Sequence, residues 1–358
     1  MHPRLKWSFF GSSLVSAYWN GAATYYRGMI RELSKLGHDI TFYEPNAYDR
    51  QKNRDISDPS WAEVEVYEPN FDSLYQMLEK AKGSDVIVKA SGVGVFDEEL
   101  EKSIIEQKHS SSTSIFWDVD APATLDRLTE NLEDPFHSLI PQFDFIFTYG
   151  GGPPVVKKYS SFGARECTPI YNALDPQTHF PVFPETRFSG TIGFLGNRLP
   201  DREERVENLF FESARRLSDK DFVLGGSGWA DKSIPENLRY LGHVYTHEHN
   251  AFNSSLLSVL NISRDSMARY GFSPATRIFE AAGAGACILT DSWDGIENFL
   301  EPGREILVVK NAGEIVEILD SLSTAKAKKI GEAAFKRINS EHTYSKRAKE
   351  VDSILRNT

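Results

Sequence analysis

Short apolar segments that each end in Gly, Ser or Asp recur along the whole chain, and they constrain its fold more than any other feature. In the first half we predict buried strands at residues 5–10, 39–44, 85–89, 114–117 and 143–148, and the apolar spacing of residues 22–36 predicts a helix. Strands that alternate with loops and helices in this way build parallel sheets. Ligands of such sheets bind outside the carboxyl ends of the strands, where these polar loops lie.

The same alternation starts again after a segment rich in proline and aromatic residues. Residues 176–190 contain Pro176, Pro181 and Pro184, a spacing that a helix does not tolerate. Beyond this segment we predict strands at residues 191–195, 222–224, 238–241, 260–263, 287–289 and 306–308, and a helix at 202–217. The sequence thus predicts a first domain at residues 1–175, a linker at 176–190, a second domain at 191–338 and a terminal segment with a charged helix at 339–358.

Composition narrows the class of protein. A chain of 358 residues, 40% hydrophobic and 25% charged, suits two globular domains. The net charge of −11 argues against a nucleic-acid partner, which would need a basic face. Cys167 and Cys287 have no metal-binding spacing and imply no disulfide framework, so we expect a cytoplasmic protein. No apolar run is long enough to predict a transmembrane segment.

The stretch from Arg277 to Asp291 carries the most chemical information. Glu280 stands at the start of a helix of small residues, which lets a neighbouring backbone or a ligand approach closely. A carboxylate in this place can accept hydrogen bonds from the hydroxyls of a ribose. The alternative interpretation is a tightly packed helix with a surface glutamate.

Several motifs together resemble the GT-B glycosyltransferases, and in particular the spore-maturation-protein (CgeB-like) group, whose C-terminal half belongs to the glycosyl transferases group 1 class. The motifs are Tyr18–Gly28, Gly37–Glu44, Asp118–Pro122, Tyr149–Pro153, Tyr171–Pro176, Gly193–Arg198, Tyr270–Glu280 and Glu301–Leu307. The resemblance covers nearly the whole chain. Each motif alone is weak, and their order and spacing carry the assignment.

The resemblance implies an α/β protein with the GT-B fold, in which two doubly wound, Rossmann-like domains face each other across a cleft and the terminal helix returns to the first domain. It also implies transfer of a sugar from a nucleoside-diphosphate-sugar, of the UDP or dTDP type, to an acceptor that the sequence does not identify. No cofactor and no metal are expected. Related enzymes carry a pair of glutamates eight positions apart; Glu280 matches the second, but Phe272 stands at the place of the first.

The second domain is expected to hold the donor. We predict that Arg198 and one of Arg264 and Arg277 contact the diphosphate, since arginine binds phosphate oxygens in a bidentate manner. The alternative is that each arginine pairs with a nearby acidic residue. His243 and Val244 stand where such folds hold the base, and His243 is equally well explained as a surface histidine. The other residues predicted to contact the donor are Gly196, Asn197, Gly226, Gly271, Phe272, Ser273 and Glu280.

On the acceptor side, Asn20 and Gly21 precede the first helix and are predicted to reach the donor phosphates, or else simply to cap that helix.

Asp118 and Asp120 end a buried strand, and repulsion between two close carboxylates raises the pKa of one of them, which suits a general base. Asp120 is the preferred base if the reaction inverts the sugar. The alternative is that one of the two carboxylates caps the following helix. The spacing of Asp118 and Asp120 also fits a magnesium site, whereas His243, His247 and His249 fit no standard zinc site.

Three other functions share parts of this pattern. A sugar-nucleotide epimerase and a noncatalytic nucleotide-sugar-binding protein would have the same architecture. A nicotinamide-dependent dehydrogenase ranks last, because the first loop, Gly11–Ser16, lacks the glycine spacing that a dinucleotide pyrophosphate requires.

Overall fold

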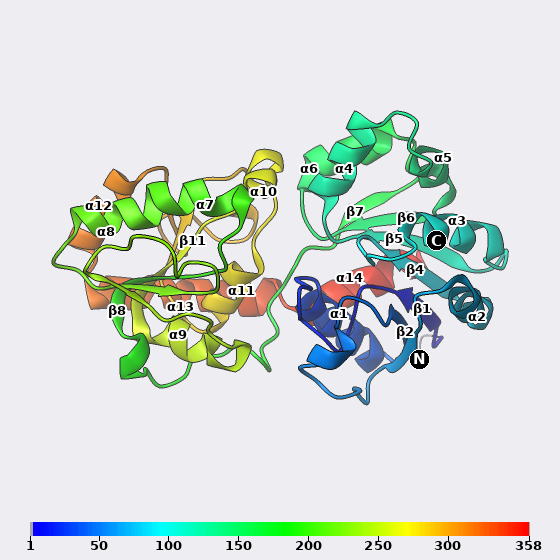
Figure 1. Ribbon diagram of the computed structural model, residues 1–358, viewed down its shortest axis with the longest axis horizontal. Helices are drawn as coiled ribbons and strands as arrows, with labels where there is room; N and C mark the ends of the chain where they lie inside the picture. The colour runs from blue at the N-terminus through cyan, green and yellow to red at the C-terminus, as the bar shows by residue number, and fades with distance from the viewer. Residues whose placement is uncertain (1–2, 358) are drawn as a thin grey trace. The chain divides into compact units, whose positions relative to one another are not determined.

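A computed structural model describes residues 3–357 of the chain. Two compact units divide it: the first comprises residues up to Tyr171 together with the segment from Tyr344, and the second runs from Asn172 to Thr343 (Figure 1). Each unit is a parallel sheet with helices on its faces, so the prediction of an α/β protein with two doubly wound domains is confirmed. None of the helices formed by the described residues is both long and apolar enough to cross a membrane.

The first unit contains a seven-stranded sheet in the order β3-β2-β1-β4-β5-β6-β7. Its strands are β1 (Lys6–Phe10), β2 (Asp39–Pro45), β3 (Glu63–Tyr67), β4 (Val86–Ala90), β5 (Thr113–Asp118), β6 (Phe145–Thr148) and β7 (Cys167–Pro169). Its helices are α1 (Ala23–Lys35), α2 (Phe71–Ala81), α3 (Asp97–Gln107), α4 (Ala121–Glu130), α5 (Phe136–Leu139), α6 (Gly152–Ser161) and α14 (Tyr344–Arg356). All neighbouring strands pair in parallel.

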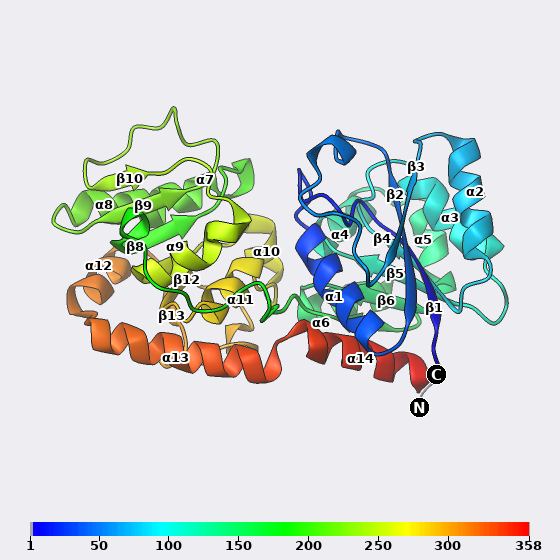
Figure 2. The same cartoon turned by 90° about the horizontal axis from the view of Figure 1, so that it is seen from below.

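The last helix of the chain, α14, belongs to the first unit and packs along α1 (Figure 2). The contact requires a glycine in α1, because a Cβ on Gly28 would lie 2.3 Å from the ring of Tyr344. His38 adds a polar contact, with its Nε2 atom 3.0 Å from a carboxylate oxygen of Asp352. A segment more than 300 residues away in sequence thus completes the first sheet's helical layer.

The second unit contains a six-stranded sheet in the order β10-β9-β8-β11-β12-β13, again with all strands parallel. Its strands are β8 (Gly190–Leu195), β9 (Phe222–Gly225), β10 (Leu238–Tyr240), β11 (Leu256–Asn261), β12 (Ile288–Asp291) and β13 (Leu307–Val309). Its helices are α7 (Pro200–Val206), α8 (Glu212–Arg216), α9 (His249–Ser255), α10 (Asp265–Tyr270), α11 (Thr276–Gly283), α12 (Ala312–Ser321) and α13 (Thr324–Glu341), with a π-helical turn, Glu207–Phe211, between α7 and α8. Helices α7, α8 and α12 cover one face of the sheet, and α9, α11 and α13 cover the other (Figure 1).

The segment predicted as a linker packs on the second unit over much of its length. Phe188 is fully buried, with its ring centroid 5.8 Å from that of Phe252. The amides of Val182 and Glu185 donate hydrogen bonds to the hydroxyls of serines in α9. The prolines prevent a long helix here, as expected. Phe188 is buried against the second unit, whereas Phe180 and Phe183 are exposed.

Candidate donor site at the carboxyl ends of the second sheet

The strand order of the second sheet reverses direction between β8 and β11, and ligands of doubly wound sheets bind at such a switch point. Two loops approach each other closely at this point. Gly226 has a φ of +123°, and a Cβ on it would lie 2.3 Å from the carbonyl oxygen of Gly196. The loops that follow β8 and β9 are therefore in contact, and the Gly196–Arg198 and Gly226 segments that were predicted as donor contacts lie together.

Two arginines meet at this point. Arg202, in the first turn of α7, and Arg277, in the first turn of α11, both direct a guanidinium group at Gly196, where a Cβ would lie 2.9 Å from one Nη2 atom and 3.0 Å from the other. Each guanidinium carbon also lies 5.5 Å from the ring centroid of Phe194. Such contacts with an aromatic ring hold a cation without neutralising its charge.

Neither guanidinium group forms a close ion pair with a carboxylate of the described residues, although Glu280 and Asp291 act on Arg277 from a greater distance. Within residues 3–357, no carboxylate oxygen lies within 4.0 Å of a side-chain nitrogen of Arg202 or Arg277; Arg277 donates to the amide oxygen of Asn261 and Arg202 to the carbonyl of Asn197. Burial, with a further contribution from the nearby charge of Arg277, lowers the pKa of Arg202 to about 9. Burial likewise lowers the pKa of Arg277. Two partly buried cations side by side are unfavourable unless an anion compensates them.

Arg198 and Arg264, the other arginines predicted to contact the diphosphate, are engaged by acidic side chains. Arg198 donates to Glu203 at 2.6 Å and to Asp231 at 3.0 Å, and Arg264 donates to Asp201 at 2.6 Å. This is the arrangement that the alternative interpretation expects. The geometry thus favours Arg277 and adds Arg202, which the sequence analysis did not single out.

Glu280 lies one helical turn after Arg277 on α11 and is turned inward rather than toward bulk water. Its side chain is 16% exposed, and its carboxylate faces His179 at 3.7 Å and His249 at 3.6 Å. Burial alone would raise the pKa of Glu280, but the two imidazoles and Arg277 outweigh it and lower the pKa to about 2. The small residues of α11 allow close packing, as expected, since a Cβ on Gly283 would lie 2.4 Å from Leu174. Glycine at this position brings the segment that carries His179 against α11.

The remaining predicted contacts lie on neighbouring loops of the same unit. His243 is exposed beside Tyr245, and Val244 is buried. Phe272 has a φ of +46°, and its amide donates to the carbonyl of Asp294 at 2.6 Å. A Cβ on Gly295 would lie 2.2 Å from the Phe272 ring, so the aromatic side chain that replaces the expected glutamate packs into its own loop. Two loop residues hold each other, since the Ser273 hydroxyl donates to the carbonyl of Gly271.

In the first unit, Asp118 and Asp120 have different environments. Asp118 is fully buried and accepts hydrogen bonds from the amide of Asp120 and the hydroxyls of Thr124 and Tyr159. Burial raises the pKa of Asp118, against the lowering effect of Tyr159. Asp120 is partly exposed and stands directly before α4, but its side chain does not cap that helix. The geometry makes Asp118 a structural carboxylate and leaves Asp120 as the better candidate for chemistry.

Asn20 holds its own loop together. Its amide group donates to the carbonyls of Ser13 and Ser16, and its oxygen accepts from the Ser12 hydroxyl. The side chain of Asn20 is therefore occupied by the loop, and Ala22, rather than Asn20, stands at the cap position of α1. Gly21 is exposed, and a Cβ on it would meet no atom within 4 Å, so packing does not explain this glycine.

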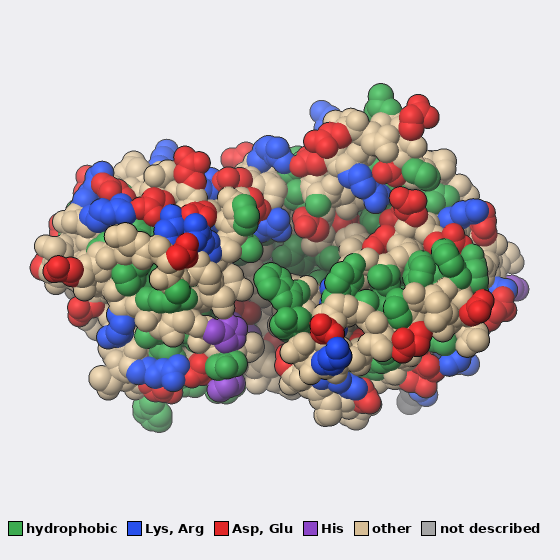
Figure 3. Space-filling model, in the orientation of Figure 1, with side chains coloured by type: hydrophobic (Ala, Val, Ile, Leu, Met, Phe, Trp, Pro, Cys, Tyr) green, Lys and Arg blue, Asp and Glu red, His purple; other side chains and the backbone are tan. Residues whose placement is uncertain are grey.

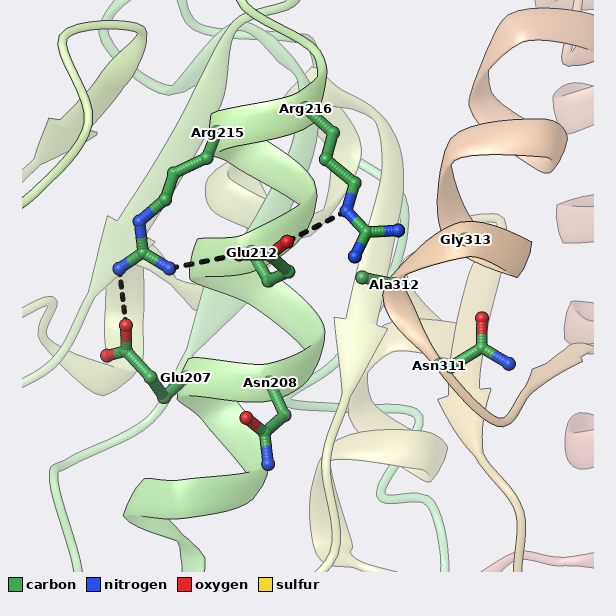
Figure 4. Close-up of a pocket in the computed structure, with 8 residues that line it drawn as sticks. All are labelled: Glu207, Asn208, Glu212, Arg215, Arg216, Asn311, Ala312 and Gly313. Carbon is green, nitrogen blue, oxygen red and sulfur yellow. Dashed lines mark hydrogen bonds and ion pairs between the residues drawn. The ribbon is translucent and has the colours of Figure 1, made fainter.

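A separate cavity of about 400 Å³ lies between α8 and the start of α12 (Figure 4). Two arginines line it, but Arg215 pairs with Glu207 and Glu212, and Arg216 donates to Glu212 at 2.8 Å. The arginines of this cavity are thus paired with glutamates, whereas Arg202 and Arg277 have no such ion pairs. On the face drawn in Figure 3, acidic and basic side chains of this unit are likewise intermingled.

Comparison with known proteins agrees with this architecture. A sucrose-phosphate synthase from Thermosynechococcus elongatus superimposes with a TM-score of 0.68 at 12% sequence identity, over 99% of both chains. An α-glucosyltransferase solved with UDP and a 13-mer DNA gives a TM-score of 0.71 at 13% identity, over 99% of this chain and 100% of the other. The chain has the GT-B glycosyltransferase fold. The Anabaena protein HepE, solved with UDP and glucose, matches this GT-B chain with a TM-score of 0.67 at 11% identity, over 99% and 100% of the two chains.

The sequence adds a family match over part of the chain. Residues 202–353 match the family described as glycosyl transferase-like, in agreement with the motifs that lie in this part of the sequence. A search of curated proteins finds no match. The narrower CgeB-like assignment stays a prediction.

Proposed function

We propose that the second unit binds a nucleoside-diphosphate-sugar and that the protein transfers the sugar to an acceptor. The observation that carries the proposal is the pair Arg202 and Arg277, two partly buried guanidinium groups without a carboxylate partner at the switch point of a parallel sheet. Arginine pairs bind phosphate oxygens with directed, charge-assisted hydrogen bonds. A diphosphate supplies the negative charge that this point of the fold lacks.

Glu280 is proposed to hold the ribose. It follows Arg277 by three residues on α11, a rise of about 4.5 Å along the helix. One helical turn thus presents a cation and a carboxylate side by side, as a nucleotide presents its phosphate beside its ribose hydroxyls. The low pKa of Glu280 keeps it ionised at neutral pH, so that it accepts hydrogen bonds. The loop with His243 and Val244 is proposed to hold the base through its main chain.

The donor is proposed to be of the UDP or dTDP type, since solved structures of the same fold contain UDP. Asp120 is proposed as the general base if the reaction inverts the sugar. The diphosphate is neutralised by arginines and main-chain amides, so the proposal includes no metal and no cofactor in the transfer. The proposed partners are a nucleotide-sugar and an acceptor other than nucleic acid, although one protein of this fold was solved with DNA.

Thermal stability measured with UDP, dTDP and GDP tests the proposal. A nucleotide present at about 100 times its dissociation constant stabilises the folded protein by roughly 2.7 kcal/mol. We expect this stabilisation from UDP or dTDP and its loss in Arg277→Ala. An unchanged unfolding transition with all three nucleotides would contradict the proposal.

Turnover separates the proposal from its alternatives. Incubation of a UDP-sugar with candidate acceptors should release UDP and form a glycoside. An epimerised donor without any acceptor would show a sugar-nucleotide epimerase instead. Nucleotide binding without either product, over a broad panel of acceptors, would show a binding protein.

A further inference from the structure

Three side chains with metal-ligating groups converge inside the second unit. His179 precedes β8, His249 is the first residue of α9, and Glu280 lies on α11. The Nε2 atom of His179 is 3.7 Å from one carboxylate oxygen of Glu280, and the Nδ1 atom of His249 is 3.6 Å from the other. One ligand atom from each of the three residues lies within 4.8 Å of the other two.

Both imidazole nitrogens that face the carboxylate are buried and lack a hydrogen-bond partner. Their distances to Glu280 exceed those of hydrogen bonds, and a buried polar atom without a partner is destabilising. His179 is 6% exposed, and its Nδ1 atom lies 2.9 Å from the hydroxyl of Thr178. In the tautomer in which Nδ1 donates to this hydroxyl, Nε2 presents a lone pair toward Glu280, and outer hydrogen bonds orient metal-bound histidines in the same way.

We infer that His179, His249 and Glu280 form a binding site for a divalent transition metal, with Zn²⁺ as its best ligand. Two imidazoles and one carboxylate are a ligand set that Zn²⁺ accepts in four-coordinate sites. Ligand atoms about 2 Å from a tetrahedral ion are roughly 3.3 Å apart. The two nitrogen–carboxylate distances, 3.7 and 3.6 Å, are close to this value, and all three ligand atoms lie within 4.8 Å of one another. Mg²⁺ and Ca²⁺ prefer oxygen ligands and fit this set poorly.

We expect water at the fourth coordination position. The side chains of His249 and Glu280 are 20% and 16% exposed, so these two residues are not fully sealed from solvent. Arg277 is the nearby cation that opposes a metal, but its guanidinium group is directed away, to Gly196 and the amide oxygen of Asn261. Glu280 therefore supplies the negative charge of the site.

This inference does not rest on the proposed function. A bound metal occupies the carboxylate that is assigned to the ribose, so the ion and the nucleotide are alternative occupants of Glu280. The test of the metal site therefore contains no nucleotide, and its failure leaves the proposed function untouched.

Calorimetric titration of the chelator-treated, full-length protein with Zn²⁺ tests the site. We expect one ion per chain, and His249→Ala, His179→Ala and Glu280→Gln should each weaken binding by more than about tenfold, since removal of even an outer-shell partner has an effect of that order. His247→Ala is the matched control, because His247 is exposed and lies two residues before His249, in the short turn that precedes α9. Histidine side chains gather at this edge of the unit near α9 (Figure 3), so the control separates the site from adventitious surface binding.

Two results would overturn the inference: no stoichiometric binding, or equal affinity in the unaltered protein and His249→Ala. Because His179 is buried, the variant of the partly exposed His249 carries the test if His179→Ala does not fold. Co²⁺ provides a second readout. Tetrahedral Co²⁺ bound by nitrogen and oxygen should give visible absorption bands that disappear in His249→Ala, whereas a near-ultraviolet thiolate band would place the ion on a cysteine and contradict the inference.

Discussion

Arg202 and Arg277 are 75 positions apart in sequence, but both direct their guanidinium groups at the same glycine, Gly196. The guanidinium carbon of each lies 5.5 Å from the ring centroid of Phe194. The first turns of α7 and α11 bring them there because both helices begin at the carboxyl edge of the sheet, next to β8 and β11. The pair concentrates positive charge at one point of a chain whose net charge is −11. The account of donor binding depends on this pair.

Removing either arginine should weaken nucleotide binding. Hydrogen bonds to charged groups contribute about 1.5–3 kcal/mol each, so Arg202→Ala and Arg277→Ala should each raise the Kd for UDP or dTDP by roughly 10- to 150-fold. Calorimetric titration measures the change. Arg216→Ala is the control, because Arg216 is held by Glu212 on α8 and should leave the Kd unchanged.

The sequence pattern predicts that Arg198 contacts the diphosphate, whereas the structure favours Arg202, and a variant of Arg198 separates these two interpretations. In the structure two carboxylates hold its guanidinium group, so Arg198→Ala should weaken nucleotide binding much less than Arg202→Ala does. The same calorimetric titration compares the two variants. A larger effect at Arg198 would show that the nucleotide breaks these ion pairs and that the sequence pattern identified the phosphate contact correctly.

The two aspartates after β5 should respond differently to substitution. Asp118→Ala leaves three donors without their acceptor in a buried place, and each buried donor without a partner costs about 1–3 kcal/mol of stability. Asp120→Asn should leave the melting temperature nearly unchanged and lower kcat. Denaturation curves and turnover rates of both variants check this. Full activity of Asp120→Asn would remove it as a candidate base.

Two glycines near the candidate donor site allow a matched test of how closely the backbone of the two loops is packed. Gly226 and Gly242 both have positive φ, but only at Gly226 would a Cβ collide with backbone, 2.3 Å from a carbonyl oxygen. Gly242→Ala should cost about 1–3 kcal/mol of unfolding free energy from the unfavourable dihedral alone. Gly226→Ala should cost more, because the loops after β8 and β9 must also separate. Urea denaturation of both variants measures the difference, and equal costs would contradict the close contact of the two loops.

Much of the fold followed from local sequence patterns. The strands that end in glycine or aspartate were predicted within a few residues, since their apolar runs and polar ends are both local. Strand β3 (Glu63–Tyr67) was missed because it alternates Glu with Val and Tyr and contains no continuous apolar run. Strand β7 has only three residues, Cys167–Pro169, and two of them are not apolar enough to signal a strand.

The site was less predictable, because its contacts join distant residues. Arg202 looked like an ordinary helix residue, and its approach to Gly196 appears only when α7 folds back beside β8. Arg198 is paired with Glu203, five positions away, and also with Asp231 on another loop, a contact that no local pattern indicates. His179 and Glu280 are 101 positions apart, so no spacing rule could have placed them together.

A crystal structure of the protein with UDP would test the central claim most directly. The account predicts that the diphosphate lies against Gly196, in hydrogen-bond contact with the guanidinium groups of Arg202 and Arg277, and that Glu280 accepts a hydrogen bond from the ribose. A nucleotide bound elsewhere on the chain, with both guanidinium groups still lacking an anion, would contradict it.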